Sequence, residues 1–305
     1  MSHSHSHNHS HHHHQLNGRN LIISIVLNIA ITTAQIIGGV ISGSLALLSD
    51  ALHNFSDVLS LIISLVANKL VRKKASLQRT FGYKRAEILA AFINAASLII
   101  VAIFLMIEAV ERYRNPQEIE SNLVIWLSLI AILGNGFSVL LLRSNAKDNM
   151  NMKTVYLHLF TDMMASIAVL VGGLLMKFYQ IWWIDSLLTF AIAIYLIVMG
   201  WDLLKSSFKV LMLFTPDATS VKAIVEDIES LNLVKNVHHV HIWQLNEDET
   251  HLEAHIDFKE DITLSRFDVI LGEIETIVKQ NHGINHVNIQ PEFGKRDAKD
   301  IIVQD

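Results

Sequence analysis

Long apolar runs dominate the chain from residue 21 to residue 204, and short polar segments separate them. Each run is close to the roughly 20 residues that a helix needs to cross about 30 Å of hydrocarbon. The pattern therefore predicts six transmembrane helices. They are expected at 21–41, 45–70, 86–110, 121–142, 154–176 and 181–204. Pro116 and Pro216 fall outside these runs and interrupt none of them.

The pattern after residue 212 is that of a small soluble domain. Apolar spacing predicts helices over 217–231 and 264–280, the first capped by Thr215 or Asp217. Alternating residues predict three strands, at 237–245, 250–258 and 285–290. The order αββαβ is typical of a ferredoxin-like α+β sandwich with helices on one sheet face. We therefore expect an all-α membrane domain over 20–212, an α+β domain over 213–292, and tails at 1–19 and 293–305.

Composition narrows the functional classes. The 305 residues are 51% hydrophobic and 17% charged, with a net charge of -5, so nucleic acid is not an expected partner. The chain has no cysteine, which excludes disulfides, iron-sulfur clusters and thiolate zinc sites and leaves nitrogen and oxygen as metal ligands. Neither a GxxxxGK[ST] phosphate loop nor HExxH occurs, so the sequence indicates neither an ATP-driven pump nor a zincin-type protease. We expect no organic cofactor.

Basic residues in the loops are divided unequally between the two sides of the predicted bilayer. Thirteen fall on the side of the termini, and only Arg112, Arg114 and Lys177 fall on the other. The positive-inside rule then places both termini in the cytoplasm of a multi-pass protein of the inner (cytoplasmic) cell membrane. The first fourteen residues hold eight histidines among Ser and Asn and are expected to be disordered. An expression tag and a native metal-collecting tail are both compatible with them.

Two predicted spans carry ionisable residues in the same HxxxD spacing. His53 and Asp57 lie in the second span, and His158 and Asp162 lie in the fifth. Residues four apart share one face of a helix, so each span presents an imidazole beside a carboxylate. If the two faces meet, they supply two nitrogens and two oxygens, a set that suits tetrahedral Zn²⁺, Cd²⁺ or Co²⁺.

The alternative is that these residues form hydrogen bonds between packed helices, which contribute only about 1 kcal/mol each in membranes. That role suits Asn28 and Asn135. It does not account for two carboxylates, because a charged Asp at a helix centre costs about 2.5 to 3.5 kcal/mol. The pattern therefore favours a metal site. Asp50, one turn before His53, is a candidate for supporting that site or for relaying the cation.

Five segments in this order resemble the cation diffusion facilitator family. They are SLALLSDALHNFSD (44–57), RTFGYKRAEILAAFIN (79–94), the second HxxxD, IDSLLT (184–189) and VHHVHIW (237–243). The resemblance, of the zinc type found in bacterial cobalt-zinc-cadmium efflux, covers residues 16 to 292. It implies a homodimer of six-span protomers that exports divalent metal, chiefly Zn²⁺, in exchange for protons. The family's intramembrane ligands fall on His53, Asp57, His158 and Asp162.

The resemblance also implies that residues 213–292 form a cytoplasmic metal-binding dimerisation domain. Regulatory metal binding falls on His238, His255 and Glu292, with Gln290 and His286 as further candidates. Strict strand alternation places His238 on the apolar face unless a bulge turns it. A solvated sheet with incidental histidines is the alternative.

Three functions are compatible with these features. The first is a secondary transporter that exports Zn²⁺, and also Cd²⁺ or Co²⁺, in exchange for protons across the lipid bilayer. The second is a membrane-anchored metal sensor, which would not require matched intramembrane ligand pairs. The third is a metal-dependent membrane enzyme, which needs an open coordination position. Four protein ligands close the predicted site, so we do not expect an enzyme.

Overall fold

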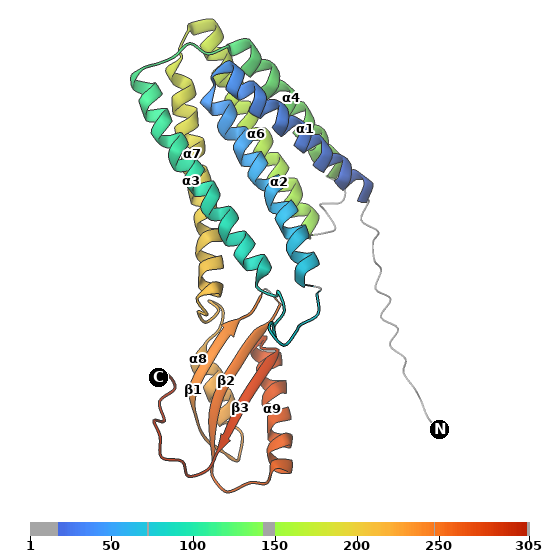
Figure 1. Ribbon diagram of the computed structural model, residues 1–305, viewed down its shortest axis with the longest axis vertical. Coiled ribbons are helices and arrows are strands. Elements are labelled where there is room, and N and C mark those ends of the chain that lie inside the picture. Colours follow the sequence, from blue (N-terminus) through green and yellow to red (C-terminus); the bar gives the residue numbers. More distant parts are fainter. Residues whose placement is uncertain (1–17, 72, 143–149, 247, 304–305) are drawn as a thin grey trace, which may run out of the picture. The chain divides into compact units, whose positions relative to one another are not determined.

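Six long helices occupy the six predicted apolar runs (Figure 1). The computed structural model describes the chain except for residues 1–17, 72, 143–149, 247 and 304–305. The helices are α1 (Gly18–Ser42), α2 (Leu45–Val71), α3 (Ala86–Arg114), α4 (Ser121–Leu142), α6 (Met150–Tyr179) and α7 (Trp183–Leu211). The predicted membrane all-α fold is therefore confirmed. The His-rich segment 1–14 lies outside the described residues.

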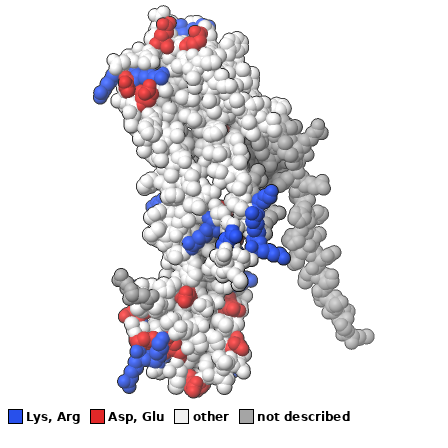
Figure 2. Space-filling view, in the orientation of Figure 1, with Lys and Arg blue, Asp and Glu red and all other residues white. Residues whose placement is uncertain are grey.

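Four of the described helices are long and apolar enough to cross a membrane, namely α3, α4, α6 and α7. The apolar stretch described for α1 is shorter and covers Val26–Ser42. Large apolar side chains such as Phe104, Trp126 and Leu140 are exposed on these helices. Figure 2 shows the viewed face of the helices largely without charged side chains. Such a surface is stable in contact with lipid.

Small residues allow α1 and α4 to pack closely, as they do in many membrane helix pairs. A Cβ atom added at Gly38 would lie 1.8 Å from Leu127 Cδ1, and one added at Gly134 would lie 2.2 Å from Ile31 Cδ1. Each glycine thus faces a branched side chain of the opposite helix. Both positions leave no room for a larger residue without a shift of the neighbour.

The chain divides into two compact units. Residues 1–59 with 98–198 form the first, and residues 60–97 with 199–305 form the second. The division passes through α2, α3 and α7, whereas the boundary predicted at residue 212 follows the change in composition. Each candidate metal site lies inside a single unit: the site between α2 and α6 lies in the first unit, and the site in the C-terminal elements lies in the second.

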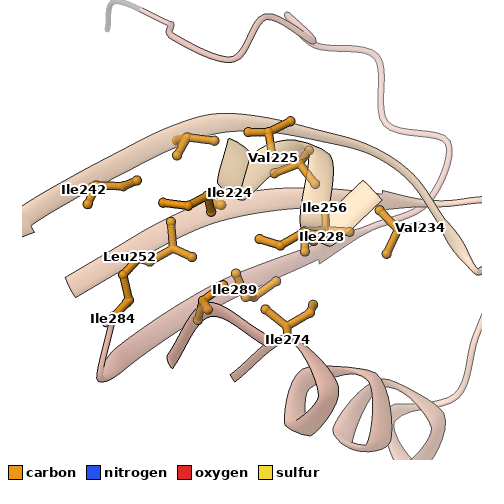
Figure 3. Packing of buried hydrophobic residues seen from close by; sticks show 14 of the residues in the cluster. Ile224, Val225, Ile228, Val234, Ile242, Leu252, Ile256, Ile274, Ile284 and Ile289 are labelled. Atoms are coloured by element: carbon orange, nitrogen blue, oxygen red, sulfur yellow. The ribbon is translucent and has the colours of Figure 1, made fainter. Parts of the chain in front are cut away.

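The C-terminal elements follow the predicted order αββαβ. They are α8 (Val221–Glu229), β1 (Val234–Gln244), β2 (Thr250–Phe258), α9 (Leu264–His282) and β3 (His286–Glu292). The sheet order is β1-β2-β3, with β1 antiparallel and β3 parallel to β2. Both helices bury their apolar residues against one face of the sheet, where Ile224, Ile256 and Ile274 are fully buried (Figure 3). The opposite face carries the polar residues that matter for metal binding.

Capping residues define where the two helices of this domain begin. The prediction of Thr215 or Asp217 as the cap of α8 is wrong, because Thr219 N–H donates to the Pro216 carbonyl and forms a turn there. The helix begins after Ser220 instead, whose side chain accepts from Ala223 N–H. Helix α9 begins after Thr263, whose side chain caps it in the same way.

The segment after β3 packs against the edge of β1 rather than leaving the domain. His239 N–H donates to the Asp300 carbonyl at 3.1 Å, and Val240 N–H donates to the Ile301 carbonyl at 2.8 Å. Ile301 also packs against the domain core. The predicted tail at 293–305 is therefore held in place over its described part, which ends at residue 303.

Candidate metal centres

Helices α2 and α6 bring the two HxxxD pairs together. His53 and Asp57 project from α2, and His158 and Asp162 project from α6. Each imidazole lies beside the carboxylate of its own helix and beside that of the other helix. The meeting of the two faces, on which the sequence argument depended, is thus present in the structure.

The four side chains form a closed ring in which nitrogen and oxygen atoms alternate. His53 Nε2 lies 3.7 Å from Asp57 Oδ2 and 3.5 Å from Asp162 Oδ1. His158 Nε2 lies 3.3 Å from Asp57 Oδ2 and 3.6 Å from Asp162 Oδ2. Zinc bonds of about 2.1 Å place neighbouring tetrahedral ligands roughly 3.4 Å apart. The spacing of the ring therefore fits a tetrahedral metal.

Three of the four residues meet a stricter test of convergence. His53, His158 and Asp162 bring ligand atoms within 4.8 Å of one another. Asp57 lies outside that set, although its Oδ2 is close to both imidazoles.

Burial and hydrogen bonding set this ring apart from ordinary polar packing. The Asp162 side chain is 1% exposed, whereas His158 and Asp57 are 39% and 30% exposed. Both oxygens of Asp162 and Oδ2 of Asp57 are buried without a hydrogen-bond partner among the described residues. Buried carboxylate oxygens without donors are costly. A cation would satisfy them, and it would enter from the side of His158 and Asp57.

Asp50 lies one turn before His53 and joins three helices. Its Oδ2 accepts hydrogen bonds from Gln35 Nε2 of α1 at 2.7 Å and from Ser166 Oγ of α6 at 3.1 Å. Asn54 Nδ2 donates to Gln35 Oε1 at 3.4 Å. These buried bonds link α1, α2 and α6 next to the ring, which agrees with a supporting role for Asp50.

Asp185 of α7 is buried and caps a different helix. Its position near the end of the sixth predicted span is compatible with a solvated or a capping role. The structure shows a capping role, because the carboxylate accepts from Ser44 Oγ at 2.5 Å and from Leu45 N–H at 2.8 Å, with Ala46 N–H at 3.3 Å. Leu45 and Ala46 are the first residues of α2, and Ser44 directly precedes it. Asp185 therefore anchors the helix that carries His53 and Asp57.

In the C-terminal domain a bulge in β1 turns His238 toward the polar face. The register between β1 and β2 shifts between His238 and His241, and His239 adopts a φ of 49°. His238 therefore pairs with His255 of β2, and its side chain is fully buried. Strict alternation, which places His238 on the apolar face, is wrong because the bulge adds a residue at this point.

His238, His255 and Glu292 lie together, as the resemblance implied. His238 Nε2 is 3.2 Å from Glu292 Oε2, and His255 Nδ1 is 3.1 Å from Glu292 Oε1. Asp297 joins them, so that the four side chains bring ligand atoms within 4.8 Å of one another. Sequence reasoning missed Asp297, which belongs to the segment taken as a tail. An acidic residue five positions after Glu292 was the only signal.

The two further candidates of the sheet take other roles in the structure. Gln290 donates to Glu292 Oε1 at 2.8 Å, which orients the carboxylate. The His286 ring lies 4.3 Å from that of His251, away from Glu292. Neither belongs to the group of convergent ligand atoms found among the described residues.

Lysines surround the carboxylates of the cluster that His238, His255, Glu292 and Asp297 form. Burial opposes the ionisation of Glu292, but hydrogen bonds from Lys295 and Lys299 outweigh it and lower its pKa to about 2. Burial also lowers the pKa of His255, although the charge of Glu292 opposes this effect. Glu292 is therefore ionised and His255 is neutral near pH 7, which are the forms that bind metal.

The chain matches two family models along most of its length. Residues 21–212 match the cation efflux transmembrane domain, and residues 216–293 match the cytoplasmic domain of cation efflux proteins. The cadmium, cobalt and zinc/H(+)-K(+) antiporter of Bacillus subtilis is 36% identical over 278 residues, which cover 90% of this chain and 89% of the relative.

Two further relatives are also similar to this chain over most of their length. The metal cation efflux system protein CzcD of Cupriavidus metallidurans is 34% identical over 284 residues, covering 93% of this chain and 89% of the relative. The zinc transporter ZitB of Escherichia coli is 30% identical over 295 residues, which cover 96% of this chain and 93% of the relative. With both domains matched in order and relatives aligned over nearly their whole length, the chain belongs to the cation efflux family.

Proposed function

We propose that this multi-pass membrane protein exports a divalent metal, Zn²⁺ with Cd²⁺ and Co²⁺ as further substrates, in exchange for protons. The observation that carries the proposal is the closed ring formed by His53, Asp57, His158 and Asp162. The names of the relatives, two of which are antiporters or transporters of zinc, agree with this substrate class.

Exchange follows from the chemistry of the ring. Metal binds neutral imidazole and ionised carboxylate, so protons and metal compete for the same atoms of His53 and His158. A ring that faces a more acidic compartment releases metal and takes up protons. If it returns protonated, the inward proton gradient drives the outward movement of metal. Imidazole suits this role because its unperturbed pKa near 6.5 allows modest changes in pH around neutrality to change its protonation.

The orientation and assembly of the chain are part of the proposal. Figure 2 shows Lys and Arg side chains gathered on part of the viewed face, and thirteen basic residues fall on the side of the termini in the topology expected from the sequence. The positive-inside rule then places both termini in the cytoplasm, with export across the inner membrane. The match to a cytoplasmic domain agrees with this arrangement. We propose a homodimer in which the cytoplasmic domains meet.

The cytoplasmic cluster of His238, His255 and Glu292 is proposed to bind zinc as a regulatory ligand. The sensor hypothesis would make this cluster the principal site of the protein. It leaves the intramembrane ring without a role, although burying Asp162 in the membrane is costly. The transport hypothesis accounts for both sites and is the one that the relatives support.

Metal uptake into proteoliposomes loaded at acidic pH tests the transport proposal. The intact chain is compared with Asp162→Ala, and with Asp202→Ala as a control for an exposed carboxylate of α7. Zn²⁺, Cd²⁺, Co²⁺ and Mn²⁺ are measured side by side. We expect the intact chain and the control to transport zinc and Asp162→Ala to lose at least about 100-fold in rate, because one of four zinc ligands is removed.

Two outcomes would contradict the proposal in different ways. Equal zinc flux in the intact chain and in Asp162→Ala would show that the ring is not the carrier, and the sensor hypothesis would then be preferred. A flux that depends on Asp162 but not on the imposed pH gradient would leave the ring as the carrier and remove the proton exchange.

A further inference from the structure

The segment after β3 brings two charged residues to the cytoplasmic cluster. Its backbone pairs with the bulge of β1 through Asp300 and Ile301, so the residues just before them are held near His238. Asp297 Oδ2 lies 3.8 Å from His238 Nε2. Lys299 forms an ion pair with Asp297 and reaches into the same cluster.

Lys299 contacts the atoms that a metal would use. Its Nζ lies 3.2 Å from His238 Nε2, 3.0 Å from Glu292 Oε2 and 3.2 Å from Asp257 Oδ2. An ammonium group donates only, so a hydrogen bond between Nζ and His238 Nε2 uses the lone pair of Nε2. Zinc needs that same lone pair at about 2.1 Å. Lys299 and a metal ion therefore cannot both occupy their best positions.

The donor set fits zinc once the lysine is displaced. Two imidazoles and two carboxylates offer the same N₂O₂ composition as the intramembrane ring, and their ligand atoms lie within 4.8 Å of one another. His255 Nδ1, which lies 3.1 Å from Glu292 Oε1, is buried without a hydrogen bond in the part of the chain that the structure describes. Lys299 Nζ also forms ion pairs with Asp297, Glu292 and Asp257, which hold its ammonium group in the cluster.

We propose that the C-terminal segment regulates the cytoplasmic metal site, with Asp297 as a fourth ligand and Lys299 as a tethered cation that zinc must displace. The inference rests on the cytoplasmic part of the proposed function. The competing reading is that Lys299 only forms ion pairs that stabilise the fold. The two readings predict different effects of removing Lys299 on zinc affinity. A competitor weakens zinc binding, so its removal strengthens binding, whereas the removal of a purely structural ion pair does not.

Zinc titration of the full chain in detergent tests the inference. The host lacks residues 2–14 and carries Asp57→Ala and Asp162→Ala, so that the tail and the ring do not bind zinc. We expect Lys299→Gln to bind zinc about tenfold more tightly, because the neutral amide no longer competes, and Asp297→Asn to bind about tenfold less tightly.

A matched control and a site control accompany these variants. Lys259→Gln removes a lysine of the same domain whose Nζ donates to the Asn232 carbonyl, and it is expected to leave zinc affinity unchanged. His255→Ala removes a proposed ligand and is expected to abolish cytoplasmic binding.

A second measurement follows the lysine itself. Acetylation of the host by an amine-reactive ester, read by peptide mass spectrometry, reports whether Lys299 Nζ is held in the cluster. We expect zinc to raise the acetylation rate of Lys299 severalfold and to leave that of Lys259 unchanged. In His255→Ala the zinc effect on Lys299 should disappear.

Each outcome bears on the inference. If zinc binds but Lys299→Gln binds no more tightly and acetylation does not change, Lys299 is only an ion-pair partner and the inference fails. If neither the host nor Lys299→Gln binds zinc, the cytoplasmic site and this inference fail together. Zinc flux through the intramembrane ring is measured separately and would still stand.

Discussion

Replacing Asp185 with Ala removes the cap of the helix that carries half of the intramembrane ring. Three donors at the start of α2 lose their acceptor. They are the hydroxyl of Ser44, which precedes the helix, and the backbone N–H groups of Leu45 and Ala46. All three residues are buried, so water cannot replace the carboxylate. We expect a large loss of stability from this one substitution.

The magnitude follows from two opposing effects. A hydrogen bond to a charged group contributes about 1.5 to 3 kcal/mol, so three such bonds contribute roughly 5 to 9 kcal/mol. Removing the buried carboxylate also relieves a desolvation cost of about 3 kcal/mol. The expected net loss is therefore about 4 kcal/mol in the free energy of unfolding. For a domain of this size it lowers the thermal midpoint by roughly 8 to 16 °C.

Thermal unfolding of purified protein in detergent, followed by the fraction that remains monodisperse, measures this change. Asp202→Ala is the matched control, because it removes an exposed carboxylate from the same helix. Asp185→Asn keeps one acceptor oxygen and should lie between the native chain and Asp185→Ala. The reasoning is refuted if Asp185→Ala unfolds at the temperature of the control.

Three further predictions concern other parts of the chain. Asp162→Asn should abolish zinc transport yet raise the thermal midpoint of the metal-free protein. The reason is that it removes the charge of a buried carboxylate whose oxygens have no hydrogen-bond partner among the described residues. A lowered midpoint would indicate a structural role for Asp162. Gly38→Val should lower the free energy of unfolding by about 2 kcal/mol, because the new side chain forces Leu127 away. Gly272→Ala should raise it by about 1 kcal/mol, because alanine favours the helix α9 and its Cβ meets no atom within 4 Å; thermal unfolding measures both changes. The pKa of Glu292 is lowered from 4.5 to about 2, so its contribution to stability is complete above about pH 4.5 and lost as the pH falls toward 2, which urea unfolding at a series of pH values would detect.

Local spacing made the intramembrane ring predictable. An HxxxD pair places its two side chains on one helix face whatever the rest of the fold does, and a buried carboxylate in an apolar run demands a partner. The apolar runs likewise define the membrane helices, because their length is set by the bilayer. Only the meeting of α2 with α6 required the structure.

Features that depend on contacts between distant segments could not be read from the sequence. Thr215, Asp217 and Ser220 are all good capping residues, and the turn at Pro216 decides among them. The bulge beside His238 has no sequence signal as strong as the alternation that it breaks. Asp297 becomes a candidate ligand only when the last segment pairs with β1.

The position of that last segment has a consequence for the evolution of metal response in this family. Asp297 and Lys299 lie beyond residue 293, where the match to the cytoplasmic domain ends. Substitutions of Asp297 or Lys299 change the cytoplasmic cluster without altering the domain core or the membrane helices. Chains with the same histidines in the sheet but different C-terminal ends are therefore expected to respond at different cytoplasmic zinc concentrations.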